Sequence, residues 1–321
     1  MLPNFRYVRP TSLNEAVKEL ASPEARLHAG GTDLLGCLRD AVFPAQKIVS
    51  LSGVAELRGI APAGGGLRIG PLVTLTEIAA DRSIREQYAA LAQAAASVGS
   101  PQLRNQGTLG GNLCQRPRCW YFRGDFHCFR KGGETCYASE GENEYHCIFG
   151  GDGCYMVHPS DVAPALIALE AEVRIAGPNG KRTVPLESFF VPPSKDFTKE
   201  TVLEPGEIVT EVVLPPAAGV RSSYRKVRVR AAFDFALAGV AVALRTRDGR
   251  IASSRVVLSG VAPIPWRATA AEKALAGRAL DAAAAAEAAA RAVDGAKPLS
   301  QNAYKVDLVR GIVEETLLLS A

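Results

Sequence analysis

The sequence lacks most of the features that assign a chain to a common class of protein. Its net charge of 37 − 33 = +4 is too small to indicate a nucleic-acid-binding protein. No apolar run approaches the roughly 18 residues that a membrane-spanning helix requires. Histidine is scarce, with four in 321 residues, so few side chains are available for acid–base catalysis. What remains is a globular chain long enough for about two domains.

Cysteine is also scarce outside one segment, because six of the seven cysteines lie within residues 114–154. The N-terminus lacks the basic-then-apolar plan of a signal peptide, which favours a cytoplasmic protein; export to the periplasm together with a partner is the alternative. A reducing compartment disfavours disulfides and favours a metal or redox role for the thiols. The segment is polar and rich in glycine, so a buried array of inert thiols is the less favoured interpretation.

The spacing of these cysteines favours an iron–sulfur cluster over zinc. The gaps between them are 4, 8, 7, 10 and 6 residues, and no Cys-x2-Cys pair is present. A 4Fe–4S cluster needs four thiolates and accepts irregular spacing when a loop surrounds it. Cys114 and Cys147 have apolar neighbours typical of packing residues, and His127 and His146 are not needed as ligands. The four cysteines with charged or glycine-rich neighbours are Cys119, Cys128, Cys136 and Cys154.

Two glycine loops are candidates for binding a phosphorylated cofactor. They are "AGGTDLLG" at residues 29–36 and "RNQGTLGGNL" at residues 104–113. Neither matches the Walker loop or the dinucleotide G-x-G-x-x-G pattern. Both could still offer consecutive backbone N–H groups to phosphate oxygens, with Thr32 or Thr108 adding a hydroxyl. Together with the cysteines, the loops indicate a redox cofactor that contains a pyrophosphate.

The remaining patterns predict an α+β fold in two or three parts. Helices are expected at residues 12–20, within 74–98, after Asp161, at 280–293 and over the last 17 residues or so. Strands are expected at 25–29 and 47–51, with hairpins that turn at Asn179-Gly180 and Asp248-Gly249. The polar, proline-bearing segment "VPPSKDFTKE" is a candidate boundary. We therefore expect one domain at 1–185, divided into 1–55 and 56–185 with an insert at about 114–155, and a second domain at 190–321.

The order of motifs "HAGGTDLL…GTLGGN…PSD…YRKVR" resembles the flavin-binding medium subunits of the xanthine dehydrogenase family of molybdenum hydroxylases. The resemblance covers essentially the whole chain. About forty residues are inserted between the Gly-Gly-Asn loop and the Ser-Asp pair. That insert is similar to the subset with an extra 4Fe–4S cluster, such as 4-hydroxybenzoyl-CoA reductase and the bacterial periplasmic aldehyde oxidoreductase. The family resemblance implies a two-part FAD-binding domain of the vanillyl-alcohol oxidase-like (PCMH) type. It also implies a C-terminal domain of the CO dehydrogenase flavoprotein type, with an antiparallel sheet and helices.

The resemblance also implies particular cofactor-binding residues. It places the FAD pyrophosphate on the first loop, the ribityl chain at Asp161, and the isoalloxazine edge near Lys226, with Val209 as an apolar neighbour of the flavin. It implies the same four cluster ligands as the local argument, with Cys147 as the alternative to Cys154 for the fourth. The implied flavin contacts in full are Leu27, His28, Ala29, Gly30, Gly31, Thr32, Asp33, Leu34, Thr108, Leu109, Gly110, Gly111, Asn112, Asp161, Val209 and Lys226. As a plain structural alternative, Asp161 could be a helix N-cap and Lys226 a solvated strand residue.

The implied function is electron transfer. The chain would bind FAD non-covalently and one 4Fe–4S cluster, with no catalytic residue of its own. Its partners would be a large subunit with molybdopterin and a small subunit with two 2Fe–2S clusters, in a heterotrimer or a dimer of heterotrimers. Two alternatives from other classes stay open, a non-catalytic chain with structural zinc and a free-standing flavin oxidase. We also expect the cysteine segment to depend on cluster ligation for its order, because its apolar content is low.

Overall fold

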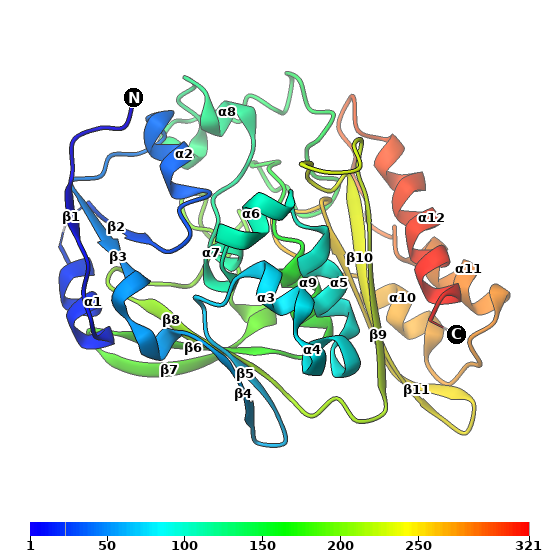
Figure 1. The fold of residues 1–321 in the computed structure, drawn as a ribbon. Coiled ribbons are helices and arrows are strands. Elements are labelled where there is room, and N and C mark those ends of the chain that lie inside the picture. The colour runs from blue at the N-terminus through cyan, green and yellow to red at the C-terminus, as the bar shows by residue number, and fades with distance from the viewer. Residues whose placement is uncertain (23, 321) are drawn as a thin grey trace.

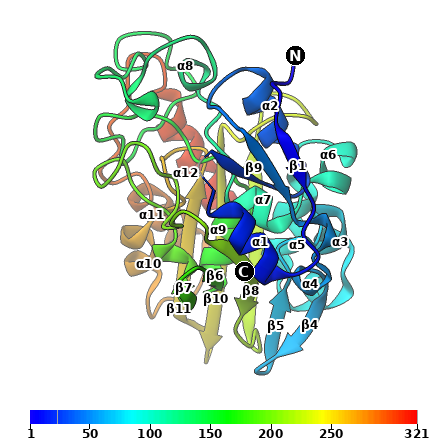
Figure 2. The same ribbon diagram turned by 90° about the vertical axis from the view of Figure 1, so that its left-hand side faces the viewer.

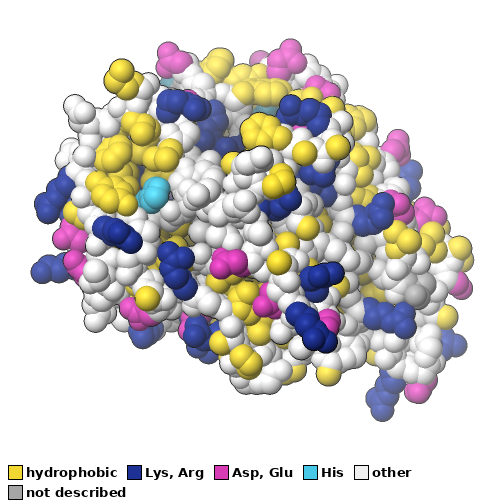
Figure 3. Space-filling model, in the orientation of Figure 1, with side chains coloured by type: hydrophobic (Ala, Val, Ile, Leu, Met, Phe, Trp, Pro, Cys, Tyr) yellow, Lys and Arg dark blue, Asp and Glu magenta, His cyan; other side chains and the backbone are white. Residues whose placement is uncertain are grey.

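A computed structural model describes residues 1–22 and 24–320 of the chain. Three sheets follow one another across the molecule from the N-terminal to the C-terminal side, and each carries its own helices (Figure 1). This arrangement confirms the α+β class. None of the helices in the described residues is long and apolar enough to cross a membrane. Basic and acidic side chains are interspersed over the face shown in Figure 3, in keeping with the small net charge.

The first sheet is parallel and has the order β1-β3-β2. Its first helix begins at Ser12, whose Oγ accepts a hydrogen bond from the N–H of Glu15 at 3.3 Å. The Glu15 carboxylate accepts from the N–H of Thr11 at 2.9 Å, where a full capping box would have it accept from the N–H of Ser12. The elements are β1 Arg6–Val8, α1 Leu13–Leu20, β2 Ala25–His28, α2 Leu34–Arg39 and β3 Lys47–Ser50, followed by 3₁₀ turns at Leu51–Gly53 and Ala55–Leu57.

The second sheet is antiparallel, with the order β4-β5-β8-β6-β7. Its middle strand, β8, comes from beyond the polar segment 192–201, so this sheet draws strands from both sides of the expected boundary. The expected hairpin is present, but its two turn residues are Pro178 and Asn179, because Gly180 is the first residue of β7 and pairs with Gly177. The strands are β4 Ile60–Ala63, β5 Gly66–Ile69, β6 Glu172–Gly177, β7 Gly180–Pro185 and β8 Ile208–Leu214, with a 3₁₀ turn at Leu186–Ser188.

The helices of this unit lie between the second and third sheets (Figure 1). Residues 74–98, expected to hold one or two helices, hold three, because the backbone is extended at Asp81 and irregular at Tyr88. The full capping box of Thr74 and Glu77 is present, as expected. The helices are α3 Leu75–Ala80, α4 Arg82–Gln87, α5 Ala89–Ser97, α6 Pro101–Gln106, α7 Leu109–Leu113 and α9 Val162–Ala168.

The third sheet is antiparallel, with the order β12-β11-β10-β9, and is covered on both faces. Ala241 and Ala243 of β10 pack into the core shared with α5 and α9, whereas Val240 and Val242 pack under the C-terminal helices. Alternate residues of one strand therefore bury both faces, which explains why β10 reads as an unbroken apolar run. The elements are β9 Val220–Val227, β10 Ala238–Arg247, β11 Arg250–Ser259, β12 Trp266–Arg267, α10 Thr269–Leu275, α11 Ala282–Arg291 and α12 Tyr304–Leu318.

The cysteine segment has little regular structure, only α8 Trp120–Arg123 and a 3₁₀ turn at Phe129–Lys131. It is nevertheless not the exposed polar loop that the sequence suggested. Ile148 and Phe149 are buried in the C-terminal core, and the ring of Phe149 stacks on Trp266 with 5.1 Å between centroids. The segment lies above the first and third units in Figure 1 and above the C-terminal helices in Figure 2.

Candidate functional site

The two glycine loops border one cleft of about 290 Å³ between the first and second units. They touch at Gly30, where an added Cβ would lie 1.9 Å from the carbonyl oxygen of Gln106. Gly31 has a φ of +75°, a left-handed conformation that suits glycine. Gly110 also packs closely on Pro71, since a Cβ there would lie 2.7 Å from the proline Cβ. Both loops therefore need glycine because other backbone or a proline ring lies against them.

The loops differ in the backbone donors that they leave free. In the second loop, Leu109 donates to the carbonyl of Val73, Gly110 to that of Pro71, and Gly111 to Oγ1 of Thr108. In the first loop, the N–H groups of residues 30–34 donate to no other atom of the described chain. The expectation that both loops offer consecutive N–H groups is therefore wrong for the second loop. Its glycines bring the backbone close, and the first loop supplies the donors for an anion.

A second recess, of about 210 Å³, continues from this cleft toward the third sheet. The two share Thr32, Asp33, Thr108 and Gly111 in their walls, so together they form one elongated path. Thirteen of the sixteen expected flavin contacts line it; these are Leu27, Ala29, Gly30, Gly31, Thr32, Asp33, Leu34, Thr108, Gly110, Gly111, Asn112, Asp161 and Val209. The other three, His28, Leu109 and Lys226, are not in its walls. Leu109 is fully buried in the core, and His28 bonds Ser50.

Asp161 is the polar centre of the second recess. One of its carboxylate oxygens is 2.7 Å from Nζ of Lys226, and the other accepts from the hydroxyl of Tyr224 at 2.8 Å. Burial and the charge of Asp161 hold the pKa of Tyr224 well above its usual value. The N-cap hydrogen bond of α9 comes from Ser160, whose Oγ accepts from the N–H of Ala163. Asp161 is therefore free of a capping role, and its carboxylate faces the recess.

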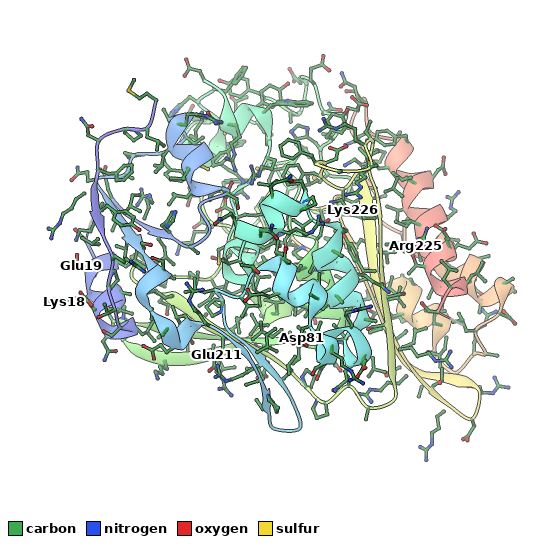
Figure 4. All side chains as sticks on the ribbon, in the orientation of Figure 1. Lys18, Glu19, Asp81, Glu211, Arg225 and Lys226 are labelled. Atoms are coloured by element: carbon green, nitrogen blue, oxygen red, sulfur yellow. The ribbon has the colours of Figure 1, made fainter. Side chains whose placement is uncertain are left out.

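Lys226 lies on β9 beside Arg225, and the two point to opposite sides of the strand (Figure 4). Arg225 faces out and pairs with Glu315 of α12 at 2.7 Å. Lys226 faces in, with a side chain only 3% exposed. The alternation of a strand thus gives the inner position to the lysine. Lys226 is a buried partner of Asp161 and not a solvated strand residue.

Asp33 joins the first glycine loop to the cysteine segment. Its carboxylate accepts from the N–H of Arg116 at 2.7 Å and pairs with Arg123 at 2.7 Å and Arg118 at 3.0 Å. The guanidinium of Arg116 in turn lies over the rings of Phe43 and Phe122. These arginines were missed as site residues in the sequence, although their density between residues 116 and 130 was a signal. They make the start of the insert a wall of the cleft.

All seven cysteines are free thiols. Burial raises the pKa of Cys119 to about 12, and the charges of Cys154 and Cys136 add to this shift. Burial also raises the pKa of Cys136, with Cys154 and Cys128 adding to it. Cys136 thus interacts electrostatically with the other three expected ligands, and Cys147 interacts with Cys154 and Cys136 as well. Backbone N–H groups point at two of the sulfurs, from Tyr121 and Phe122 toward Cys119 and from Ala138 and Tyr155 toward Cys136.

Buried polar side chains also surround these sulfurs. Arg130 donates from Nε to Sγ of Cys154 at 3.3 Å, and Nε2 of His146 lies 3.3 Å from Sγ of Cys119. Nη2 of Arg130 and Nδ1 of His146 are buried and have no partner among the described residues. Burial lowers the pKa of His146 to about 4, so its ring is neutral at pH 7. Orphaned donors and N–H···S contacts are features that an anionic thiolate cluster would satisfy.

The described residues contain no group of three or more His, Cys, Asp or Glu side chains gathered closely enough to hold one metal ion. Cys147 is 1% exposed, its backbone N–H donates to the carbonyl of Tyr155, and its thiol interacts with Cys154 and Cys136, so it stays the alternative fourth ligand. Cys114 lines the flavin cleft and packs against the central core.

The other half of the insert is attached to the C-terminal domain. Asn143 and Gln301 exchange two hydrogen bonds between backbone and side chain, at 3.0 and 2.9 Å. Asn302 donates to the carbonyls of His146 and Cys147. Lys305, which is fully buried, donates to the carbonyls of Tyr145 and Gly260 at 3.0 and 2.7 Å. The sequence contained no local signal for these contacts.

Comparison with known proteins agrees with this geometry over the whole chain. The FAD binding domain in molybdopterin dehydrogenase matches residues 3–217, and the CO dehydrogenase flavoprotein C-terminal domain matches residues 222–319. The aldehyde oxidoreductase FAD-binding subunit PaoB of Escherichia coli K12 is 40% identical over 84% of this chain and 85% of its own length. The carbon monoxide dehydrogenase medium chain of Hydrogenophaga pseudoflava is 29% identical over 98% of this chain and 96% of its own length.

Solved structures show the same fold. Carbon monoxide dehydrogenase from Hydrogenophaga pseudoflava superposes with a TM-score of 0.80 over 100% of this chain and 98% of that one, at 29% identity. Quinoline 2-oxidoreductase from Pseudomonas putida 86 superposes with a TM-score of 0.79 over 100% and 98%, at 26% identity. The three sheets and their helices are thus a known architecture. The chain belongs to the FAD-binding medium subunits of the xanthine dehydrogenase and CO dehydrogenase family, and is an oxidoreductase subunit.

Proposed function

We propose that this chain is the electron-transfer subunit of a molybdenum-containing hydroxylase or dehydrogenase, and that it holds one 4Fe–4S cluster beside its FAD. Its partners are then a molybdopterin-binding large subunit and a small subunit with 2Fe–2S clusters. The observation that carries the proposal is the elongated cleft with free N–H groups at one end and Asp161 at the other, next to a group of thiols in which Cys136 interacts with Cys119, Cys128 and Cys154.

In this proposal FAD lies non-covalently along the cleft. The free N–H groups of residues 30–34 bind the diphosphate, because they are consecutive and have no protein acceptor in the described chain. Asp161 accepts hydrogen bonds from the ribityl chain, held in place by Lys226 and Tyr224. Bound FAD supplies the exchange of electrons with an external acceptor or donor. Val98 and Phe235 provide apolar walls in the recess that exclude water from the ring.

Cys119, Cys128, Cys136 and Cys154 are the proposed cluster ligands. Each cysteine of a cubane binds a different iron, so its four ligands stand farther apart than those of a single zinc ion. In the described residues, Cys136 interacts electrostatically with the other three, and no three of these side chains are gathered at one point. The N–H groups aimed at Cys119 and Cys136 would stabilise the anionic sulfurs.

The test is a visible spectrum combined with iron and flavin analysis of the purified protein. We expect the flavin absorption band, a broad brown shoulder, and close to four irons and one FAD per chain. In Cys154→Ser the shoulder and iron should fall while flavin is retained. A protein that binds zinc and no iron would refute the cluster, and one that binds no FAD would refute the flavin site.

A further inference from the structure

A buried carboxylate, Glu200, joins the proposed cluster site to the flavin cleft. It lies between β7 and β8, where its backbone carbonyl accepts from the N–H of Val191 at 3.0 Å, and the residue is 8% exposed. Its Oε1 accepts from Nη1 of Arg130 at 2.7 Å, and its Oε2 is 2.9 Å from Nε of Arg116. One carboxylate therefore accepts a hydrogen bond from one guanidinium group of the insert and forms an ion pair with a second, whose Nε–H makes no hydrogen bond within the described residues.

The first of these groups faces the cysteines. The Arg130 side chain is 1% exposed and donates through Nε to Sγ of Cys154 at 3.3 Å. Its Nη2 is enclosed and has no partner in the described part of the chain. A buried cationic donor without an acceptor is costly, and burying it is favourable only if an anion completes the site. A thiolate-bound cluster is such an anion.

The second group faces the flavin. Arg116 lines the same cleft as the first glycine loop, and its guanidinium is fixed over the rings of Phe43 and Phe122, 5.5 and 5.1 Å from their centroids. Its backbone N–H donates to Asp33 of that loop at 2.7 Å. A guanidinium in this place is suited to a diphosphate, because its planar donors match phosphate oxygens.

Two arginines share one carboxylate, which leaves one positive charge in excess along the bridge. An excess of buried charge is unfavourable by itself, but both neighbouring cofactors would be anionic. The bridge thus has an acceptor at each end only when the cofactors are bound. Glu200 keeps the two guanidinium groups in position when they are not.

We propose that Arg130, Glu200 and Arg116 form a charge bridge with a separate task at each end. Arg130 sets the reduction potential of the cluster through Cys154, Arg116 binds the flavin diphosphate, and Glu200 is the positioning residue for both. The inference rests on the proposed function, because it assigns roles toward the proposed cluster and FAD.

The potential of the cluster distinguishes this role from a merely structural one. Arg130→Gln removes a positive charge beside the cluster, so the potential should fall; Glu200→Gln removes a negative charge from the same place, so it should rise. At a fixed ambient potential the ratio of reduced to oxidised cluster should change by at least about tenfold in each case, which is about 59 mV for one electron. Arg130→Lys keeps the charge and should restore most of the parent value. The matched control is Glu204→Gln, which removes a carboxylate from an exposed pair with Lys199.

The measurements are iron content, a redox titration followed by the paramagnetic signal of the reduced cluster, and a flavin-binding titration of the holoprotein and its variants. Arg116→Gln should weaken FAD about tenfold and keep the iron. If the reduction potential of the cluster shifts in the same direction in Arg130→Gln and Glu200→Gln, or does not shift in either variant, the role of the bridge at the cluster is overturned. Unchanged FAD affinity in Arg116→Gln would overturn its role at the flavin. A parent protein without iron refutes the cluster itself, whereas an iron-loaded parent with insensitive variants refutes only this inference. If Arg130→Gln loses iron, Glu200→Gln still decides the sign, because its potential should lie above that of the parent, whereas Arg130→Lys should stay close to it.

Discussion

Replacing Gly30 by alanine tests the flavin cleft at the point where its two loops touch. The new Cβ would lie 1.9 Å from the carbonyl oxygen of Gln106, whereas ordinary contacts begin at 3.4 Å, so the loops must separate by about 3.4 − 1.9 = 1.5 Å. A displacement of this size removes hydrogen bonds from the N–H groups of the first loop to the diphosphate. Each such bond to a charged group is worth about 1.5–3 kcal/mol, so losing two costs about 3–6 kcal/mol. At about 1.4 kcal/mol for each factor of ten, FAD should bind roughly 10²- to 10⁴-fold more weakly.

The assay is quenching of flavin fluorescence when apoprotein is titrated with FAD, with circular dichroism as a check on folding. Gly36→Ala is the matched control, because its Cβ would meet only Nη1 of Arg123, at 4.0 Å, and it lies inside α2. That control should bind FAD like the parent and gain up to about 1 kcal/mol of stability from helix propensity. A folded Gly30→Ala protein that binds FAD within threefold of the parent would refute the reasoning. Gly110→Ala, whose Cβ would lie 2.7 Å from that of Pro71, provides a second variant from the opposite loop.

Four further predictions follow from the remaining contacts. Serine at Cys119, Cys128, Cys136 or Cys154 should lower the iron content, whereas serine at Cys114 or Cys147 should leave it unchanged. If the Cys147→Ser protein loses iron and the Cys154→Ser protein keeps it, Cys147 is the fourth ligand. Lys226→Met leaves the buried Asp161 carboxylate without its cation, so the free energy of unfolding measured in urea should fall by about 3–5 kcal/mol. The double variant, in which Asp161→Asn is added, should recover most of this loss. Burial lowers the pKa of Lys305 from 10.5 to about 7, so between these pH values the unfolded chain binds more protons than the folded one. The free energy of unfolding should therefore rise with pH in this range, by at most about 1.4 kcal/mol per pH unit. Lys305→Met should lose this pH dependence, and an unchanged dependence would contradict the assignment. In a protein without the cluster, a protease should cut residues 115–142 faster than in the parent, but it should spare residues 143–149, because hydrogen bonds to Gln301 and Asn302 hold them. Equal cleavage of the two stretches would contradict this prediction.

Local signals in the sequence were sufficient for elements whose partners are close in the chain. Asp248-Gly249 marked its hairpin turn correctly, and Asn179-Gly180 marked its own to within one residue, because the turn residues and both strands are adjacent in the chain. The position of β8 in the second sheet was not visible, because its neighbours β5 and β6 are far away in sequence and an apolar strand does not encode which sheet it joins. The same holds for Glu200, which looks like one more charge in a polar segment until Arg116 and Arg130 are brought to it.

In the candidate site, too, the sequence marked residues with a local pattern and did not show contacts between distant segments. Glycines and the Ser-Asp pair marked the cleft, since close backbone approach and a polar recess leave their residue types in the sequence. Which N–H groups remain free could not be read there, because the donors of Leu109 and Gly110 are used by carbonyls more than thirty residues away. The depth of the cysteine segment was likewise hidden. Its burial depends on Asn302 and Lys305, which have no pattern that links them to it.

The attachment of the insert to the C-terminal helix also fixes the order of events during synthesis. Asn143 bonds Gln301, 158 residues later in the chain, and Lys305 lies still farther on. At about 5–20 residues per second, the ribosome needs roughly 8–30 s to reach Gln301 after it has added Asn143. In that interval the early strands of the first and second sheets can pair, and the arginines at the start of the cysteine segment can bind Asp33, but residues 143–149 have no partner until Gln301, Asn302 and α12 have emerged. The second half of the segment, with Cys147, therefore stays exposed through most of translation and is buried only in the completed chain.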